Sequence, residues 1–311
     1  MSGDRRPEAR GGPEPPRPAV QLSLLADPPQ ATLPAGGPEA LAAYDLVLLN
    51  TSAGKDSSAM LDVVVARADA EGCPRERLVA VHADLGEVEW PGTPALARRQ
   101  AEHYGLRFEL TRRERTDPQT GVRGPDTILD LVARRGMWPS SRVRYCTSEA
   151  KRGPLLVLLT RLVAELGLPR PARVLSCMGL RAAESPARSK LVPFAPDERA
   201  TGGGRRRVVD RWLPIFAWRE DEVWARIHAA GLPIHDAYVV HGMPRLSCAL
   251  CVFASRAALV KAARANPDLA ARYAALEART GHRFRKDLAI AAVVAEAEAG
   301  GEVGPIEGWA A

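Results

Sequence analysis

The sequence predicts an α/β protein built on a doubly wound, about five-stranded parallel sheet with a C-terminal helical appendage. Two observations predict this class. From about residue 45, short apolar runs alternate with amphipathic helical segments, the spacing typical of βαβ units. Several of these runs end in glycines and polar residues, as expected where parallel strands end at a ligand-binding edge. Right-handed crossovers then place helices on both faces of the sheet.

Composition narrows the class further. The chain has 311 residues, 46% of them hydrophobic, which suffices for one large core. No apolar run approaches the roughly 20 residues of a membrane span, and the polar, Pro-rich start lacks the apolar segment of a secretory signal. Five cysteines are too few for a disulfide scaffold at this length. We therefore expect a cytoplasmic protein with reduced or metal-bound thiols and no membrane partner.

Three segments differ in composition. Residues 1–40 are rich in Pro, Gly and Arg and are predicted to be a disordered leader. Residues 41–252 carry the alternating strand and helix pattern. Residues 253–311 are Ala-rich and predicted to form helices broken near Pro267 and Gly281. The net charge of +6 fits anionic small substrates and does not by itself indicate nucleic acid.

The elements follow in order along the chain. Strands are predicted at about 45–50, 78–84, 106–111 and 173–178, and helices at about 55–70, 94–104, 127–135 and 154–166. Residues 112–127 are predicted to be a charged loop. Residues 186–207 form a basic, Pro/Gly-rich stretch, interpreted as a lid, a disordered segment or a solvated insertion. A helix with an acidic N-terminal end begins near residue 218 and stops at Gly231.

The first strand leads into a predicted phosphate-binding loop, Ser52-Ala53-Gly54-Lys55-Asp56-Ser57-Ser58. Unpaired N–H groups and the helix dipole favour an anion at such a helix start. The serine hydroxyls add donors, the glycine permits close approach, and Lys55 supplies a mobile positive charge. The loop is not a Walker A motif, because Asp56 follows Lys55 and Leu49 replaces the first glycine. A strand–turn–helix without a ligand is the alternative.

Two further strand ends carry polar residues. Asp84, followed by Gly86, either orients Mg²⁺ or a nucleotide hydroxyl, or caps its own turn. The fourth strand ends in Gly179, followed by three charged residues: Arg181, Glu184 and Arg188. The two arginines are predicted to hold a phosphate or sulfate, with Glu184 orienting one of them; the alternative is a solvated surface pair.

A second polar centre surrounds Cys146. Arg142 and Arg144 precede this cysteine, and Lys151 and Arg152 follow it, which predicts an anion-binding surface.

Three cysteines are candidate metal ligands. Cys248 and Cys251 form a CxxC pair, and Cys146 is the third candidate because it lies in a polar loop. Three thiolates suit a [4Fe-4S] cluster with one open iron, or Zn²⁺ with a fourth ligand such as His241. Independent thiols are the alternative. The remaining two read as buried small hydrophobes: Cys73 and Cys177.

These motifs together resemble the phosphoadenosine phosphosulfate reductase family, within the PP-loop or adenine nucleotide alpha-hydrolase-like group. The resemblance covers about residues 45–252 and rests on Ser52-Ala53-Gly54-Lys55-Asp56-Ser57, Asp84-x-Gly86, Arg144-x-Cys146 with Lys151, Gly179-x-Arg181-x-x-Glu184-Ser185-x-x-Arg188, Trp218 with Asp221, and Tyr238…Gly242-x-x-Arg245-x-x-Cys248-x-x-Cys251. It implies a five-stranded sheet binding an adenine nucleotide across the first loop. Thr147 stands where four-cysteine members have a second cysteine, and no cysteine follows Cys251, whereas the reductases use a tail cysteine.

The resemblance implies an enzyme with three groups of site residues. The catalytic group is Lys55, Asp56 and Arg181. The nucleotide group is Ser52, Ala53, Gly54, Lys55, Asp56, Ser57, Ser58, Asp84, Gly86, Gly179 and Arg181. The substrate group is Arg144, Lys151, Glu184, Arg188 and Arg245.

Three functions stay open. The first is nucleotide activation or sulfur transfer, in which ATP or an adenylyl sulfonucleotide binds with Mg²⁺, an acceptor attacks the α-phosphorus and pyrophosphate leaves. The second is sulfonucleotide reduction by a thiol of another protein or of the CxxC pair. The third is a non-enzymatic nucleotide-binding sensor of redox state or metal. Expected partners are a small anionic substrate, a sulfur donor protein, a nucleic acid such as tRNA or DNA, and a second copy of the chain.

Overall fold

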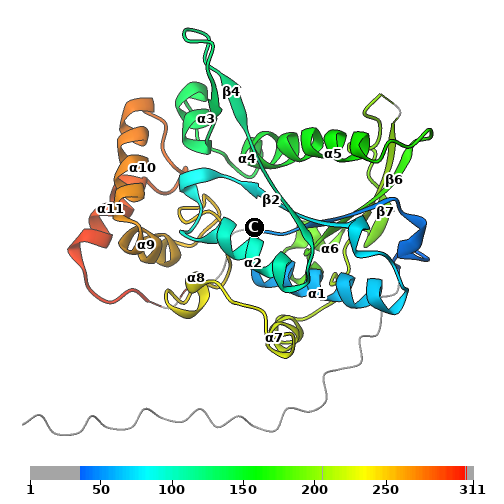
Figure 1. The fold of residues 1–311 in the computed structure, drawn as a ribbon. Coiled ribbons are helices and arrows are strands. Elements are labelled where there is room, and N and C mark those ends of the chain that lie inside the picture. Colours follow the sequence, from blue (N-terminus) through cyan, green and yellow to red (C-terminus); the bar gives the residue numbers. More distant parts are fainter. Residues whose placement is uncertain (1–35, 205, 305, 307–311) are drawn as a thin grey trace, which may run out of the picture. The chain divides into compact units, whose positions relative to one another are not determined.

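A six-stranded sheet organises the structure, a computed structural model that describes residues 36–204, 206–304 and 306 (Figure 1). The strand order is β3-β2-β1-β6-β8-β7. The strands are β1 (Leu46–Asn50), β2 (Leu78–Asp84), β3 (Arg107–Arg112), β6 (Ala172–Met178), β7 (Phe194–Pro196) and β8 (Arg207–Trp212). All neighbours are parallel except β7, which is antiparallel to β8. The predicted leader lies outside the described residues as far as residue 35.

Helices connect and cover these strands. The α-helices are α1 (Lys55–Ala70), α2 (Thr93–His103), α3 (Ile128–Arg135), α4 (Tyr145–Thr147), α5 (Gly153–Glu165), α6 (Pro186–Ser189), α7 (Glu220–Ala229), α8 (Asp236–Val239), α9 (Arg256–Ala265), α10 (Pro267–Thr280) and α11 (Ile290–Ala299). Short turns of 3-10 helix are η1 (Leu41–Ala43), η2 (Arg75–Arg77), η3 (Gly86–Val88) and η5 (Ala182–Glu184), and η4 (Ser148–Arg152) is a π-helical turn. Within the described residues, none of these helices combines the length and apolarity that crossing a bilayer requires.

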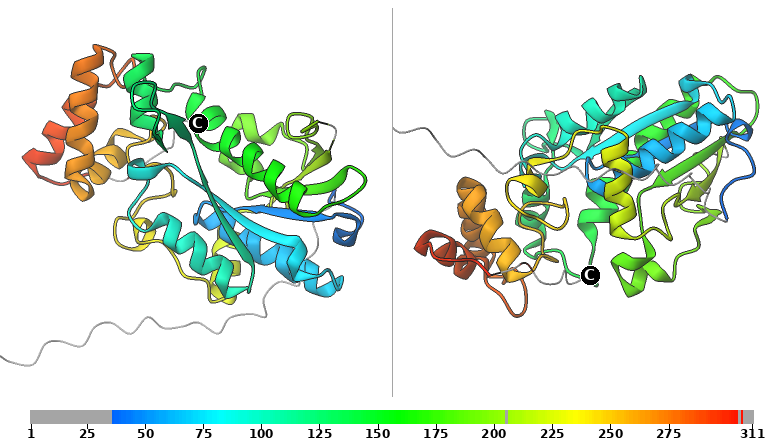
Figure 2. Two further views of the ribbon diagram at one scale, coloured as in Figure 1. Left: turned by 45° about the horizontal axis from the view of Figure 1, so that its top comes forward. Right: turned by 90° about the horizontal axis from the view of Figure 1, so that it is seen from below.

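Alternation along β1 explains the layers. Val47 and Leu49 pack in one cluster with α1 and α7, whereas Leu46 and Leu48 pack in another with α5. Because successive side chains of a strand point to opposite faces, one apolar run is buried on both sides. Figures 1 and 2 show α5 on one face of the sheet and α1, α2 and α7 on the other. The predicted doubly wound parallel sheet is confirmed.

The stretch at residues 186–207 differs from the prediction. It contains α6 and β7, and β7 pairs with β8 to make a sixth strand. Arg207 opens β8 with its side chain buried, and its guanidinium donates to Ala200 O at 2.7 Å. The disordered interpretation is therefore wrong for the described residues of this stretch, whereas the lid and solvated-insertion interpretations stay predictions. The predicted charged loop at 112–127 likewise contains an antiparallel hairpin, β4 (Glu114–Thr116) and β5 (Arg123–Pro125).

The C-terminal helices share a core with the middle of the chain. Helices α9, α10 and α11 break at the predicted positions. Trp138 packs against Tyr273 and Phe284 with ring centroids 5.0 and 5.3 Å apart, and its indole N–H donates to His282 O. The same cluster of buried side chains reaches α3 and Tyr145. These helices therefore complete the apolar wall behind Cys146.

Candidate functional site

The loop after β1 is shaped by its own hydrogen bonds. Ala53 has a left-handed backbone with φ of 58°, and Gly54 is the N-cap of α1. The hydroxyls of Ser57 and Ser58 both donate to Gly54 O, at 2.9 and 3.0 Å, instead of pointing outward as donors for an anion. Ser52 is the exposed serine of the loop. The first helical hydrogen bond runs from Ser58 N to Gly54 O, and the Lys55 N–H is taken by Tyr238, so the N–H groups of Asp56 and Ser57 are the candidates in this turn for binding an anion.

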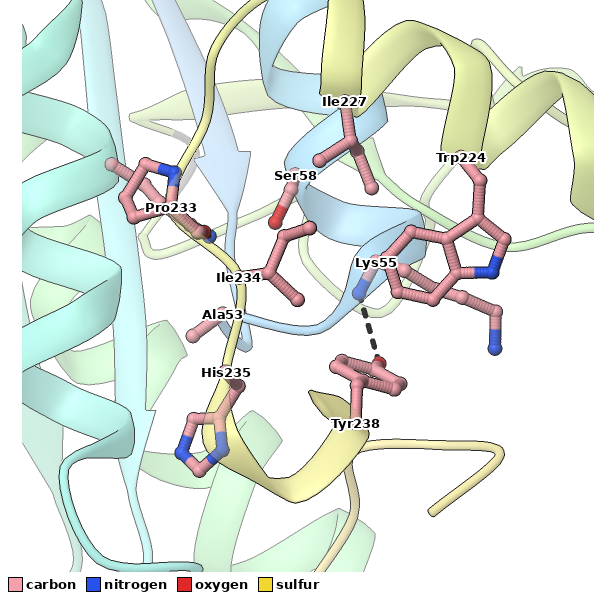
Figure 3. Close-up of a pocket in the computed structure, with 10 residues that line it drawn as sticks. Ala53, Lys55, Ser58, Trp224, Ile227, Pro233, Ile234, His235 and Tyr238 are labelled. Carbon is pink, nitrogen blue, oxygen red and sulfur yellow. Dashed lines mark hydrogen bonds between the residues drawn. The ribbon is translucent and has the colours of Figure 1, made fainter. Parts of the chain in front are cut away.

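Lys55 is not the mobile charge that the sequence predicts. Its side chain is buried, and Nζ donates to Pro244 O at 2.6 Å. Nζ also lies 3.5 Å from Glu220 Oε1. Lys55, Trp224 and Tyr238 line one narrow pocket beside α1 (Figure 3). The ammonium group is therefore held in place by residues far along the chain.

Tyr238 ties the loop to the segment before the CxxC pair. Its hydroxyl oxygen accepts a hydrogen bond from the backbone N–H of Lys55 at 3.0 Å (Figure 3). It also accepts the backbone N–H of Leu246 at 3.1 Å. Burial raises the pKa of Tyr238 to about 12, so the hydroxyl keeps its proton at neutral pH. The oxygen accepts both hydrogen bonds, so the O–H group itself can still donate to a ligand bound at the start of α1.

Arg181 reaches the loop from the end of β6. Its guanidinium is 4% exposed, and Nε donates to Asp56 Oδ1 at 2.5 Å. Gly179, two residues earlier, packs directly on the first turn of α1, because a Cβ there would lie 2.4 Å from Asp56 O and 2.7 Å from Ser57 N. The structure thus brings together Asp56 and Arg181, and gives Gly179 a packing reason to be a glycine.

Glu184 gathers two of the predicted substrate residues. Its carboxylate forms ion pairs with Arg188 and, at 2.7 Å, with Arg245, and it accepts the backbone N–H of Arg181 at 3.0 Å. Burial alone would raise the pKa of Glu184, but these three partners outweigh burial and lower it. The solvated-surface alternative is excluded for Glu184, because its side chain is only 5% exposed.

Asp84 makes the turn predicted as its alternative role. Its Oδ1 accepts the backbone N–H of Gly86 at 2.8 Å, and Gly86 has a left-handed φ of 68°. The other carboxylate oxygen is the candidate for Mg²⁺ or a nucleotide hydroxyl.

The three candidate ligand cysteines line one pocket. Cys146, Cys248 and Cys251 share it with aromatic side chains of the C-terminal core, among them Tyr273 and Phe284. Burial raises the pKa of Cys248 and of Cys251, the neighbouring thiols raise it further, and Lys151 opposes this rise. Across the described part of the chain, no three His, Cys, Asp or Glu side chains surround a single point as a metal ion requires. The described residues therefore do not form a preformed metal site at the three thiols.

The remaining predicted residues lie near this pocket. The Arg144 guanidinium stacks on the Phe253 ring at 4.5 Å, and Lys151 is exposed. His241, the predicted fourth metal ligand, stacks on Trp90 with ring centroids 5.1 Å apart. Cys73 and Cys177 are buried in the apolar core, as predicted.

Two residues beside the phosphate loop were not predicted as site residues: Tyr238 and Glu220. Tyr238 belongs to a motif quoted for the resemblance, and that spacing was the available signal. Glu220 lies in an acidic helix start that reads as ordinary dipole complementation.

Comparison with known proteins places the chain. The model of the phosphoadenosine phosphosulfate reductase domain matches residues 46–254, more than half of the chain. The chain belongs to this family. The match begins at β1 and ends just after the CxxC pair. It therefore includes the phosphate loop, the charged residues around Glu184 and the three candidate ligand cysteines.

Two relatives of this family member are matched over part of their length. A protein of Escherichia phage 186, described as "Uncharacterized 37.8 kDa protein in gpa 5'region", is 29% identical over 150 residues, which are 48% of this chain and 42% of the phage protein. Adenosine 5'-phosphosulfate reductase of Neisseria meningitidis is 37% identical over 73 residues, 24% of this chain and 27% of that enzyme. The chain thus spans less than half the length of either relative.

Two solved structures are among those to which the chain is similar. Phosphoadenylyl-sulfate (PAPS) reductase from Candida auris, in a phosphate complex, is 18% identical with a TM-score of 0.38, over 65% of this chain and 80% of that one. The U34-tRNA thiolase NcsA from Methanococcus maripaludis, solved with its [4Fe-4S] cluster, is 17% identical with a TM-score of 0.38, over 82% of this chain and 72% of that one.

Proposed function

We propose that this family member binds ATP or an adenylyl sulfonucleotide with its phosphates on residues 52–58 and promotes attack of an acceptor on the α-phosphorus. The observation that carries the proposal is the meeting of the loop after β1 with Arg181 from the end of β6, through the 2.5 Å contact to Asp56. Parallel strands bring their carboxyl ends to one edge, where ligands of such sheets bind.

The proposed step is a displacement at phosphorus. With ATP, an acceptor atom forms a bond to the α-phosphorus while the bond to the bridging oxygen breaks, and pyrophosphate leaves with that electron pair; with an adenylyl sulfonucleotide the same displacement releases sulfate. The N–H groups at the start of α1 and the guanidinium of Arg181 stabilise the negative charge that develops on the phosphate oxygens. Asp84 would hold a Mg²⁺ ion bound to the nucleotide through its second carboxylate oxygen, and the ion would neutralise charge on the phosphates.

The acceptor is proposed to be a small anion or a sulfur species. Arg188 and Arg245 are held side by side by Glu184, so they present a rigid cationic surface next to Arg181. Lys151 and Arg144 extend positive charge toward the cysteine pocket, where a thiol would be the sulfur carrier. We assign no step to a metal at the thiols, because the described side chains there do not surround one point.

Sulfonucleotide reduction is the second candidate, because three thiols line one pocket beside Lys151. Tests with two substrates separate the candidates. Pyrophosphate release from ATP in the presence of sulfide supports nucleotide activation, and sulfite release from phosphoadenylyl sulfate with dithiothreitol supports reduction. Nucleotide binding without either product supports the sensor function.

The loop assignment is tested by nucleotide binding. We expect Lys55→Ala and Ser52→Ala each to weaken ATP binding by calorimetry, Lys55→Ala by about tenfold or more, since a charge-assisted contact contributes about 1.5–3 kcal/mol. Lys190→Ala, an exposed lysine after α6, is the control. Thermal melting reports whether each variant is folded. Unchanged ATP affinity in folded Lys55→Ala and Ser52→Ala would show that the phosphates bind elsewhere.

A further inference from the structure

Glu220 contacts both cations that the proposed function places at the phosphates. It is the first residue of α7, which packs against α1. Its two carboxylate oxygens lie 3.5 Å from Lys55 Nζ and 3.7 Å from Arg181 Nη2. One carboxylate therefore bridges two side chains that come from different strand ends.

The two contacts of Glu220 are longer than the ion pair between Arg181 and Asp56. The contact to Asp56 is short, at 2.5 Å, and Asp56 lies on the loop itself. Both contacts of Glu220 exceed ordinary hydrogen-bond length, and the Glu220 side chain is 55% exposed. Because the Glu220 carboxylate stays in contact with water and both distances are long, each of these ion pairs contributes only about 0–1 kcal/mol. Asp56 is thus a structural partner, whereas Glu220 can be exchanged for another anion.

The charges of Lys55 and Arg181 indicate which anion would replace Glu220. Lys55 and Arg181 are both at least nine-tenths buried, so their two positive charges need nearby negative charge. Asp56 supplies one charge and Glu220 the other. Phosphate oxygens bridging Lys55 and Arg181 would supply the second charge in place of Glu220, with better solvation of the displaced carboxylate.

We propose that Glu220 is a competitor built into the chain, which occupies the place of a phosphate group between Lys55 and Arg181 until the β- and γ-phosphates displace it. This inference rests on the proposed function. Glu220 then lowers the affinity for the β- and γ-phosphates and speeds release of pyrophosphate, by returning to the two cations as the product leaves.

The experiment measures binding of inorganic pyrophosphate by calorimetry. Glu220→Gln removes the competing charge with almost no change of shape. Glu222→Gln is the matched control, because it removes a charge on the same turn, and its amide oxygen can still accept the N–H of Arg219 as the capping box requires. We expect Glu220→Gln to bind pyrophosphate about three- to tenfold more tightly than the wild type, from two loose ion pairs, and Glu222→Gln to bind like the wild type.

Any other result of this binding experiment would contradict the proposal in one of three ways. Equal or weaker pyrophosphate binding by folded Glu220→Gln overturns the competition and leaves the proposed function standing, because the wild type still binds. An equal gain in Glu222→Gln also overturns it, since the effect is then one of net charge. Absence of pyrophosphate binding in the wild type and both variants overturns this inference together with the proposed phosphate site.

Discussion

Replacing Gly179 with alanine tests how tightly β6 is packed on the phosphate loop. An ideal Cβ at this residue lies 2.4 Å from Asp56 O, 2.6 Å from Asp56 C and 2.7 Å from Ser57 N. All three atoms are backbone atoms, so no change of rotamer relieves the overlap. Ordinary van der Waals contact begins at 3.4 Å, so the strand end or the first turn of α1 must move by about 1 Å.

The expected cost follows from this geometry. Forcing extra atoms into a packed interior costs about 1–3 kcal/mol, and we expect Gly179→Ala to lower the free energy of unfolding by that amount. Because the moving part is the loop itself, ATP affinity should fall as well. Urea unfolding followed by tryptophan fluorescence measures the first effect, and calorimetry measures the second.

Gly153 provides the matched control. It is the first residue of α5, and the nearest atom to an added Cβ is Ser148 O at 3.5 Å, an ordinary contact. Gly153→Ala should therefore be neutral or stabilising by up to about 1 kcal/mol, as alanine is a better helix former. If Gly179→Ala matches the wild type in both stability and ATP affinity, the argument for close packing at this residue fails.

Three further changes have defined outcomes. The folded protein lowers the pKa of Glu184, so the ionised carboxylate stabilises the fold above its unfolded pKa of about 4.5, and this stability is lost as pH falls through the folded pKa. In urea unfolding, Glu184→Gln should therefore be less stable than the wild type at pH 7. The difference in free energy of unfolding should shrink below about pH 4. Ala53→Gly relieves a left-handed residue, about 1 kcal/mol, but loses a buried methyl group, about 0.8 kcal/mol, so its free energy of unfolding should stay within about 1 kcal/mol of the wild type. Tyr238→Phe leaves two backbone N–H groups without their acceptor and should lower the free energy of unfolding by about 1–3 kcal/mol in the same assay; an unchanged midpoint would mean that water replaces the hydroxyl.

Local patterns predicted the parts of the site that lie within one strand–loop–helix unit. The apolar run before Ser52 and the helix after Gly54 are both present, because burial and capping act over a few neighbouring residues. The tethering of Lys55 could not be predicted, because Tyr238 and Pro244 are more than 180 residues away in sequence and meet Lys55 only through the fold.

The difference between local patterns and contacts made through the fold also explains why β7 was missed and why the geometry at the cysteines could not be predicted. The short β7 strand, beside the glycine-rich turn at 202–204, reads as an insertion, since pairing with β8 is a tertiary event. From the sequence, Cys146 is grouped with the distant CxxC pair because all three are possible thiolate ligands, and the three cysteines do line one pocket. Their spacing around that pocket depends on Trp138, Tyr273 and Phe284, whose packing no local pattern reveals.

The hydroxyl oxygen of Tyr238 has a consequence for cooperativity. It accepts the amide N–H groups of both Lys55 and Leu246, so displacement of Tyr238 breaks the protection of both. The two amides should exchange with deuterium as one unit, although they belong to opposite ends of the matched domain. A chain cut before residue 238 would keep every strand of the sheet and still lose the acceptor at the start of α1. The loop and the cysteine segment therefore form one cooperative element.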